Sequence, residues 1–182
     1  MRILVALSAL LLVLAGAGAW IVRSEPDWYL RTRYPLAYEN IVRTHAREHD
    51  LDPALLAAVV YAESRYDPNA ESAAGAIGLM QLLPETAKGI ALRTGGTHFV
   101  LADLRDPDIN VRYGSWYIDH LRAHYDGNVR LALAAYHAGQ GNVDRWEQEG
   151  RGIEFPETKA YVDEVERVRQ VYATAYRSEL GL

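Results

Sequence analysis

From about residue 34 onward, apolar side chains recur every three or four residues, and no stretch alternates between apolar and polar positions long enough to indicate a strand. This period is typical of helices that turn one face toward a core. Proline and N-capping residues mark where helices begin, because proline fits the first helical position and Asp or Asn accepts from free backbone amides. The predicted helices begin at Pro35 and Pro53, cover residues 84–92, 108–125 and 128–138, include a short turn near Trp146, and resume at Pro156. We therefore expect an all-α domain.

Residues 3–22 form an uncharged and almost entirely apolar run. A helix of that length rises about 30 Å, which is enough to cross the hydrocarbon layer of a membrane. The length favours an uncleaved signal-anchor, whereas the small residues at 15–17 and 17–19 are typical of a cleaved signal peptide. A buried helix of the folded domain is a third interpretation, but the terminal position and the continuous apolarity speak against it. The expected divisions are a transmembrane or signal helix, a linker and one domain, at residues 1–23, 24–33 and 34–182.

The composition excludes several classes of function. A chain of 182 residues with 49% hydrophobic and 24% charged residues can bury one core. Its 19 Lys and Arg against 24 Asp and Glu give a net charge of -5, so we expect no nucleic-acid partner, because nucleic acid binds mainly to clustered positive charge. Without cysteine, the chain has no disulfide, no thiolate nucleophile and no cysteine-based metal site.

Two pairs of histidines are spaced by four residues and could each share a helix face, His45 with His49 and His120 with His124. Imidazole is a common zinc ligand, but a zinc site needs at least a third protein ligand. Neither pair lies in an H-E-x-x-H sequence, and the sequence offers no obvious third ligand. We therefore expect no metal and no cofactor.

One glutamate lies on the apolar side of the helix predicted over residues 53–66. At about 100° per residue, Glu63 falls in the middle of one arc of that helix. The same arc carries four apolar residues, Leu55, Leu56, Val59 and Val60. Burial disfavours an ionised carboxyl, so this position predicts a raised pKa and a proton donor near neutral pH. The alternatives are a helix that ends early and leaves Glu63 in solvent, or an ion pair with Arg65 or another cation.

Three segments farther along the chain combine glycine with polar and aromatic side chains. The stretch AGAIGLMQLLPETA contains Gly78, Met80 and Gln81, a mixture that suits the wall of a cleft for a polar ligand with apolar faces. The stretch LALAAYHAGQGNVDRW places Tyr136 beside a glycine-rich turn. The later stretch FPETKAYV supplies Glu157, Thr158 and Tyr161. Taken one at a time, such residues more often fill a core or cap a helix than bind a ligand.

In this order the segments resemble the soluble lytic transglycosylases, a family of peptidoglycan-cleaving enzymes with a goose-lysozyme-like helical domain. The blocks that carry the resemblance are YPLAYENIV with LDPALLAAVVYAES, GAIGLMQLLPETA, NVRYGSWYIDHL with LALAAYHAGQGNVDRW, and ETKAYVDEV, and they extend over residues 34–172. The resemblance implies a lysozyme-like all-α fold and, as the partner, the glycan strands of peptidoglycan. Together with the apolar run at residues 3–22, it implies a place in the cell envelope on the extracytoplasmic side of the plasma membrane, anchored in the membrane rather than secreted.

Carried over position by position, the resemblance assigns roles to residues in these blocks. Glu63 matches the single catalytic acid of the family. The implied substrate-binding residues are Ser64 beside that acid, Gly78, Met80 and Gln81 in the cleft, Tyr136 near the reacting sugar, His137 after it, and Glu157 and Tyr161 across the cleft. His137 departs from the family pattern, which usually has asparagine there. Because histidine keeps a hydrogen-bonding side chain, we expect an altered pH profile rather than a loss of activity.

The implied reaction uses one carboxyl, where most glycosidases use two. Asp67 and Glu71 lie near Glu63 in the sequence, but their polar, turn-like surroundings indicate exposure to solvent. In the scheme of the family, Glu63 protonates the glycosidic oxygen and the N-acetyl group of N-acetylmuramic acid stabilises the oxocarbenium-like centre. Glu63 then activates the C6 hydroxyl, which closes a 1,6-anhydro ring. Two alternatives use the same cleft: a hydrolytic muramidase that consumes water, and an inactive glycan-binding scaffold module.

Overall fold

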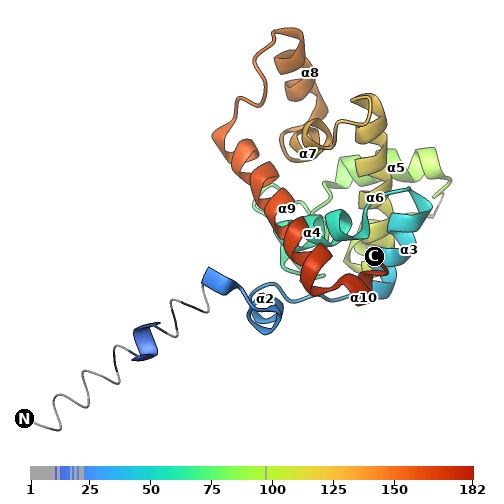
Figure 1. The fold of residues 1–182 in the computed structure, drawn as a ribbon. Coiled ribbons are helices and arrows are strands. Elements are labelled where there is room, and N and C mark those ends of the chain that lie inside the picture. Colours follow the sequence, from blue (N-terminus) through green and yellow to red (C-terminus); the bar gives the residue numbers. More distant parts are fainter. Residues whose placement is uncertain (1–10, 12, 17, 19, 21–22, 97) are drawn as a thin grey trace, which may run out of the picture. The chain divides into compact units, whose positions relative to one another are not determined.

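The chain divides into two compact units, Met1–Pro35 and Leu36–Leu182. The computed structural model describes residues 11, 13–16, 18, 20, 23–96 and 98–182 (Figure 1). Most of the predicted apolar segment, residues 3–22, therefore lies outside the described residues. Within the described part of the chain, no helix is both long enough and apolar enough to cross a membrane.

The first unit contains helix α2 (Asp27–Arg33), in the stretch that was expected to be a linker. Asp27 lies in its first turn, and Arg31 and Arg33 lie in its last turn. Acidic residues at the start and basic residues at the end of a helix interact favourably with its dipole, which gives a physical reason for helix in this polar stretch.

The second unit is a set of helices joined by loops (Figure 1). They are α3 (Glu39–Glu48), α4 (Pro53–Ser64), α5 (Pro84–Thr94), the 3-10 helix η1 (Leu101–Arg105), α6 (Pro107–His124), α7 (Val129–Ala138), α8 (Gln140–Gln148), α9 (Pro156–Ala175) and α10 (Arg177–Leu180). Among the described residues, β structure is limited to two isolated bridges, in which Ile77 pairs with Glu71 and with Leu82. The prediction of an all-α domain is confirmed.

Most helix starts lie where the sequence predicted them. Proline occupies the first helical turn at three of the predicted positions, Pro53, Pro84 and Pro156. The predicted start at Pro35 is wrong, because α3 begins at Glu39. Tyr38, its N-cap residue, has a left-handed backbone with φ of 56°, so the chain turns sharply before the helix begins.

Helix α4 is the buried central helix of this unit, and α9 runs beside it (Figure 1). Every residue from Ala54 to Tyr61 is buried, so the buried surface of the helix is wider than the single apolar arc that the sequence predicted. Outside the arc the helix carries the buried Tyr61 and several alanines, whose small side chains let neighbouring elements approach closely. The helix ends at Ser64 rather than at residue 66, since Arg65 and Tyr66 have φ of 54° and 66°.

The stretch between α4 and α5, residues 65–83, is called the cleft segment below. One buried amide side chain on α6, that of Asn110, holds it in place. Its Oδ1 atom accepts a hydrogen bond from the backbone N–H of Met80 at 2.7 Å, and its Nδ2 atom donates to the carbonyls of Ile77 at 2.9 Å and Leu104 at 2.8 Å. Asn110 thereby satisfies backbone groups that are buried away from water, as a neighbouring strand does in a sheet.

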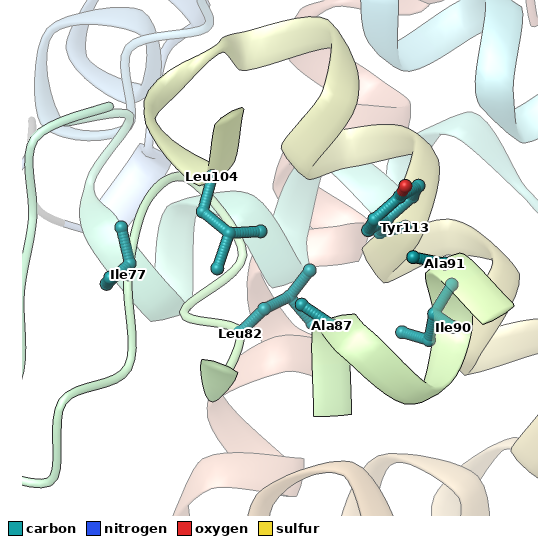
Figure 2. Packing of buried hydrophobic residues seen from close by; sticks show 7 residues of the cluster. All are labelled: Ile77, Leu82, Ala87, Ile90, Ala91, Leu104 and Tyr113. Carbon is teal, nitrogen blue, oxygen red and sulfur yellow. The ribbon is translucent and has the colours of Figure 1, made fainter. Parts of the chain in front are cut away.

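A hydrophobic cluster joins the cleft segment to α5, η1 and α6 (Figure 2). Its buried members are Ile77, Leu82, Ala87, Ile90, Ala91, Leu104 and Tyr113. Four half-buried aromatic side chains pack against the cluster, those of Phe99, Trp116, Tyr117 and Tyr136. The cluster therefore supports aromatic rings whose other sides remain accessible.

Candidate active site

A shielded carboxyl group lies in the last turn of α4. Glu63 accepts a hydrogen bond on Oε1 from the hydroxyl of Tyr161 on α9, at 2.7 Å. Burial raises the pKa of Glu63 from its usual 4.5 to about 7, and the bond from Tyr161, which favours the ionised form, only partly opposes this. Arg65, the neighbouring cation, pairs with Glu164 on α9. Near neutral pH, both the acid and the base form of Glu63 are therefore populated.

Glu63 faces a pocket of about 480 Å³, called the catalytic pocket below. Its lining residues are Glu63, Ser72, Ala74, Ala76, Gln81, Leu82, Leu83, Thr86, Tyr117, Tyr136, His137, Ala138 and Gly139. Among these described lining residues, Glu63 is the only Asp or Glu. The structure thus brings three of the predicted binding residues, Gln81, Tyr136 and His137, into one pocket with the predicted acid.

Three other predicted binding residues lie behind the wall of this pocket rather than on it. Ser64 is buried and donates its hydroxyl to the backbone carbonyl of Leu79 at 2.8 Å, which ties α4 to the cleft segment. Met80 is fully buried, and its side chain packs where a Cβ at Gly114 on α6 would collide with it. Gly78 has φ of 82°, and a Cβ there would collide with Asn110. These residues shape the wall and do not face the ligand space.

Gln81 forms the part of the wall that faces the pocket. Its backbone has φ of 46°, an uncommon conformation for a residue with a side chain. The side chain holds this turn together, because Nε2 donates to the carbonyls of Ala70 at 3.1 Å and Gly78 at 3.0 Å. The cleft segment therefore presents the Gln81 side chain to the pocket in a fixed orientation.

Tyr136, near the end of α7, bridges the pocket and the cleft segment. Its hydroxyl donates to the carbonyl of Met80 at 2.6 Å, and its ring lies 5.5 Å from that of Tyr117 on α6. Burial raises the pKa of Tyr136 well above its usual range, and the nearby charge of Glu63 raises it further. Tyr136 is thus a neutral hydrogen-bond donor at physiological pH.

His137 lies between the pocket and the start of α9. Its Nδ1 atom is 3.1 Å from the hydroxyl of Thr158, and its ring centroid is 4.6 Å from that of Tyr161. Partial burial lowers the pKa of His137 below 6.5, and the charge of Glu157 opposes this shift. Tyr161 contacts Glu63 from behind and, like the exposed Glu157, is not part of the pocket lining.

The other carboxyls near Glu63 in the sequence are engaged outside the pocket. Asp67 is exposed and accepts from the backbone N–H of Asn69 at 2.9 Å, and Glu71 forms an ion pair with Arg105 at 2.6 Å. Neither lines the catalytic pocket.

The two histidines of each predicted pair contact different partners. His45 is buried between Glu48 and Asp108, at 2.7 and 2.9 Å, and His49 lies 3.8 Å from Asp119. On α6, His120 stacks on an indole ring and His124 pairs with an aspartate of α8. No group of three His, Cys, Asp or Glu among the described residues could hold a metal ion.

Residues 40–156 match the family described as Transglycosylase SLT domain. The chain belongs to this family. The soluble lytic murein transglycosylase of Salmonella typhimurium is 31% identical over 173 residues, covering 84% of this chain and 25% of that protein. The transglycosylase of Enterobacteria phage PRD1 is 38% identical over 109 residues, covering 60% of this chain and 37% of that protein. The chain thus spans about a quarter of the length of the Salmonella relative.

Solved structures give the same result for the fold of this SLT-family chain. An inactive glutamate-to-glutamine mutant of the lytic transglycosylase Slt from Pseudomonas aeruginosa aligns with a TM-score of 0.76 and 30% identity, covering 87% of this chain and 27% of that one. The 70 kDa soluble lytic transglycosylase from Escherichia coli aligns with a TM-score of 0.74 and 29% identity, covering 80% of this chain and 25% of that one. The predicted resemblance and the lysozyme-like all-α fold are confirmed.

Sequence reasoning assigned no role to Asn110 and Tyr117, which build the site, and it named Thr158 in the stretch FPETKAYV without its partner. Asn110 and Tyr117 lie within the quoted block NVRYGSWYIDHL, but no role was assigned to them. A signal for Asn110 was available, because it precedes Gly114 by four residues and the two therefore share a helix face. The partner of Thr158, the imidazole of His137, comes from another helix, so spacing along the chain could not reveal it.

Proposed function

We propose that this domain is a peptidoglycan lytic transglycosylase. It cleaves the β-1,4 bond between N-acetylmuramic acid and N-acetylglucosamine and leaves a 1,6-anhydromuramoyl end. The observation that carries the proposal is Glu63, a single carboxyl with a pKa of about 7, bonded to Tyr161 and facing a pocket whose described lining offers no second carboxyl. Family membership supports the substrate class, because the relatives are named murein transglycosylases.

The first step needs a proton donor. A group whose pKa lies near the working pH is a good general acid, because much of it is protonated and it still releases its proton readily. The protonated Glu63 donates to the glycosidic oxygen as the bond from that oxygen to C1 of the muramoyl sugar breaks. The leaving sugar departs with a free hydroxyl, and the N-acetyl oxygen of the muramoyl sugar stabilises the positive charge at C1.

The second step needs a base and a nucleophile. Two-carboxyl glycosidases place their groups about 5–9.5 Å apart, and the second one supplies the nucleophile or activates water. With Glu63 as the only described carboxyl of the lining, the substrate supplies the nucleophile. The Glu63 carboxylate takes the proton of the C6 hydroxyl, and O6 closes on C1 to form the anhydro ring. Glu63 returns to its acid form, and no water is consumed.

The remaining side chains of the pocket bind and orient the sugar. Gln81, His137 and Thr86 supply hydrogen-bonding groups, and Tyr117 and Tyr136 supply aromatic surface. Tyr161 is a positioning residue, because it holds Oε1 of Glu63 without lining the pocket.

Product analysis tests the proposal against its alternatives. The purified protein is incubated with peptidoglycan, and the released muropeptides are separated and weighed. Anhydromuramoyl ends support the proposal, because no water is gained. Reducing ends would show a hydrolytic muramidase, and binding without cleavage would show a scaffold module.

The Glu63→Gln variant tests the assigned acid, and an inactive mutant of the Pseudomonas relative carries the same type of exchange. The amide keeps the shape of the side chain but delivers no proton, so turnover should fall by at least ~100-fold while strand binding is retained. Glu147→Gln is the matched control, since Glu147 is exposed on α8 and outside the pocket lining. A Glu63→Gln variant that digests peptidoglycan at more than about a tenth of the normal rate would refute the assignment.

The proposed place of action is the extracytoplasmic side of the plasma membrane. Residues 3–22 would serve as the tether, and the net charge of -5 gives the chain no electrostatic attraction to an anionic membrane surface. Membrane attachment would then depend on the apolar segment alone.

A further inference from the structure

A second hollow adjoins the catalytic pocket along α5 and α6. It has a volume of about 250 Å³ and shares Thr86 and Tyr117 with the catalytic pocket. Its lining also includes Trp116 and His120 from α6 and Gln140 from the start of α8. We call it the Trp116 groove. Because two residues line both hollows, the hollows are neighbours, and one ligand chain can contact both.

The indole of Trp116 is held in a fixed position at this groove. It stacks on the imidazole of His120 with ring centroids 5.1 Å apart and planes inclined by 7°. It also packs against the hydrophobic cluster formed by the cleft segment, α5, η1 and α6. Trp116 is nevertheless only half-buried and lines a further hollow of about 330 Å³ beyond the groove. A fixed ring of this kind binds a ligand at little entropic cost.

We propose that the Trp116 groove binds a sugar residue of the glycan strand that lies beyond the sugars in the catalytic pocket. The proposal rests on the function proposed above, since it extends the same strand. A pyranose ring presents C–H groups that are attracted to the negative face of an aromatic ring. The hydroxyl of Thr86 lies in the same lining and can serve the polar edge of a sugar. The side-chain oxygen of Gln140 is a second acceptor there, whereas its amide nitrogen already donates to Asp144 at 3.4 Å.

The charges in the groove fit an uncharged sugar rather than an acidic stem peptide. Glu85 pairs with Lys88 at 2.9 Å, and Arg93 donates to the backbone carbonyl of Gly89 at 3.0 Å. One acidic and one basic side chain therefore line the groove, and neither sign dominates. A carboxylate of a peptide would meet the exposed Glu85 as well as Arg93.

Binding of peptide-free glycan strands to the Glu63→Gln protein tests the inference, because the strands stay intact. One strand is short enough to fill only the catalytic pocket, and the other is long enough to reach Trp116. We expect Trp116→Leu to weaken binding of the long strand by about three- to tenfold and to leave the short strand unchanged. Trp116→Phe, which keeps a ring, should restore most of the loss. Leu92→Ala is the control, because Leu92 is 86% exposed on α5 and outside the groove lining.

Trp116 also packs on the core, so the thermal midpoint of each variant is measured alongside. Should Trp116→Leu not fold, His120→Ala tests the same stack, since His120 is exposed and its loss leaves the core intact. Equal losses on short and long strands, no loss on either, or a loss seen only with strands that carry peptides would overturn the inference. Failure of the proposed function is seen separately, as wild-type products without anhydro ends.

Discussion

Replacing Glu63 with glutamine should remove a pH dependence from the stability of the fold. In the unfolded chain the carboxyl ionises near its usual pKa of 4.5, whereas in the folded protein its pKa is about 7. Between these values the folded state binds more protons than the unfolded state, so the free energy of unfolding falls as the pH rises. The stabilisation carried by the protonated carboxyl is complete below pH 4.5 and is lost as the pH rises through 7.

The expected effect is a sizeable fraction of the stability of a domain. A rise in pKa from 4.5 to about 7, at about 1.4 kcal/mol per unit, corresponds to roughly 3 kcal/mol as an upper value. Domains of this size are stable by only about 5–15 kcal/mol. Glutamine has nearly the same shape, cannot ionise, and keeps an oxygen that can accept from Tyr161. The free energy of unfolding of the variant, relative to wild type, should therefore increase between pH 4.5 and about 7 and level off above that range.

Urea denaturation followed by circular dichroism, repeated from about pH 5 to about pH 8, measures this difference. Glu147→Gln serves again as the control, since an exposed carboxyl should show no such trend. If the difference between Glu63→Gln and wild type changes by less than about 0.5 kcal/mol over this range, burial does not raise the pKa of Glu63 as argued.

Three further predictions concern the site and the attachment of the chain. Tyr161→Phe removes the hydrogen bond that favours the ionised form of Glu63, so the pKa of Glu63 should rise above about 7. The alkaline limb of the kcat/KM profile should then move up by about one pH unit. A limb at the same pH would contradict the role of Tyr161. His137→Asn should keep activity but change the profile below pH 6.5, and identical profiles for the two proteins would refute this. The full-length protein should pellet with membranes and resist high salt, whereas the chain without residues 1–23 should be soluble and active. A native protein free of membranes, with its N-terminus near Trp20, would show that the segment is a cleaved signal.

The sequence predicted best those features that depend on local chemistry. Asp52 accepts from the backbone N–H of Ala54 at 2.8 Å, so the predicted N-cap ahead of Pro53 is present as an atomic contact. The same local reasoning failed at Tyr38 and Arg65, where the backbone is left-handed although neither residue is glycine. Such conformations cost energy locally and persist because the surrounding fold imposes them. No local pattern of residue types predicts these left-handed conformations.

The candidate site, too, was predictable only where it depends on local geometry. The direction of Glu63 followed from helical geometry, but its bond to Tyr161 joins residues on two different helices. Ser64 and Met80 were expected to bind substrate because of the resemblance, and the structure places both behind the pocket wall. The contacts that set the wall, such as Asn110 with Met80, are long-range and become visible only once the helices are packed.

The hydrogen bond from Met80 to Asn110 makes hydrogen exchange at one backbone amide informative about the cleft segment. The N–H of Met80 is bonded to a side chain of α6 and not to a helical carbonyl. Its exchange with deuterated water therefore reports how often the pocket wall detaches from α6, while the amides of the buried α4 report how often the helical scaffold opens. Faster exchange at Met80 than along α4 would show that the wall can detach from α6 while the helical scaffold stays closed.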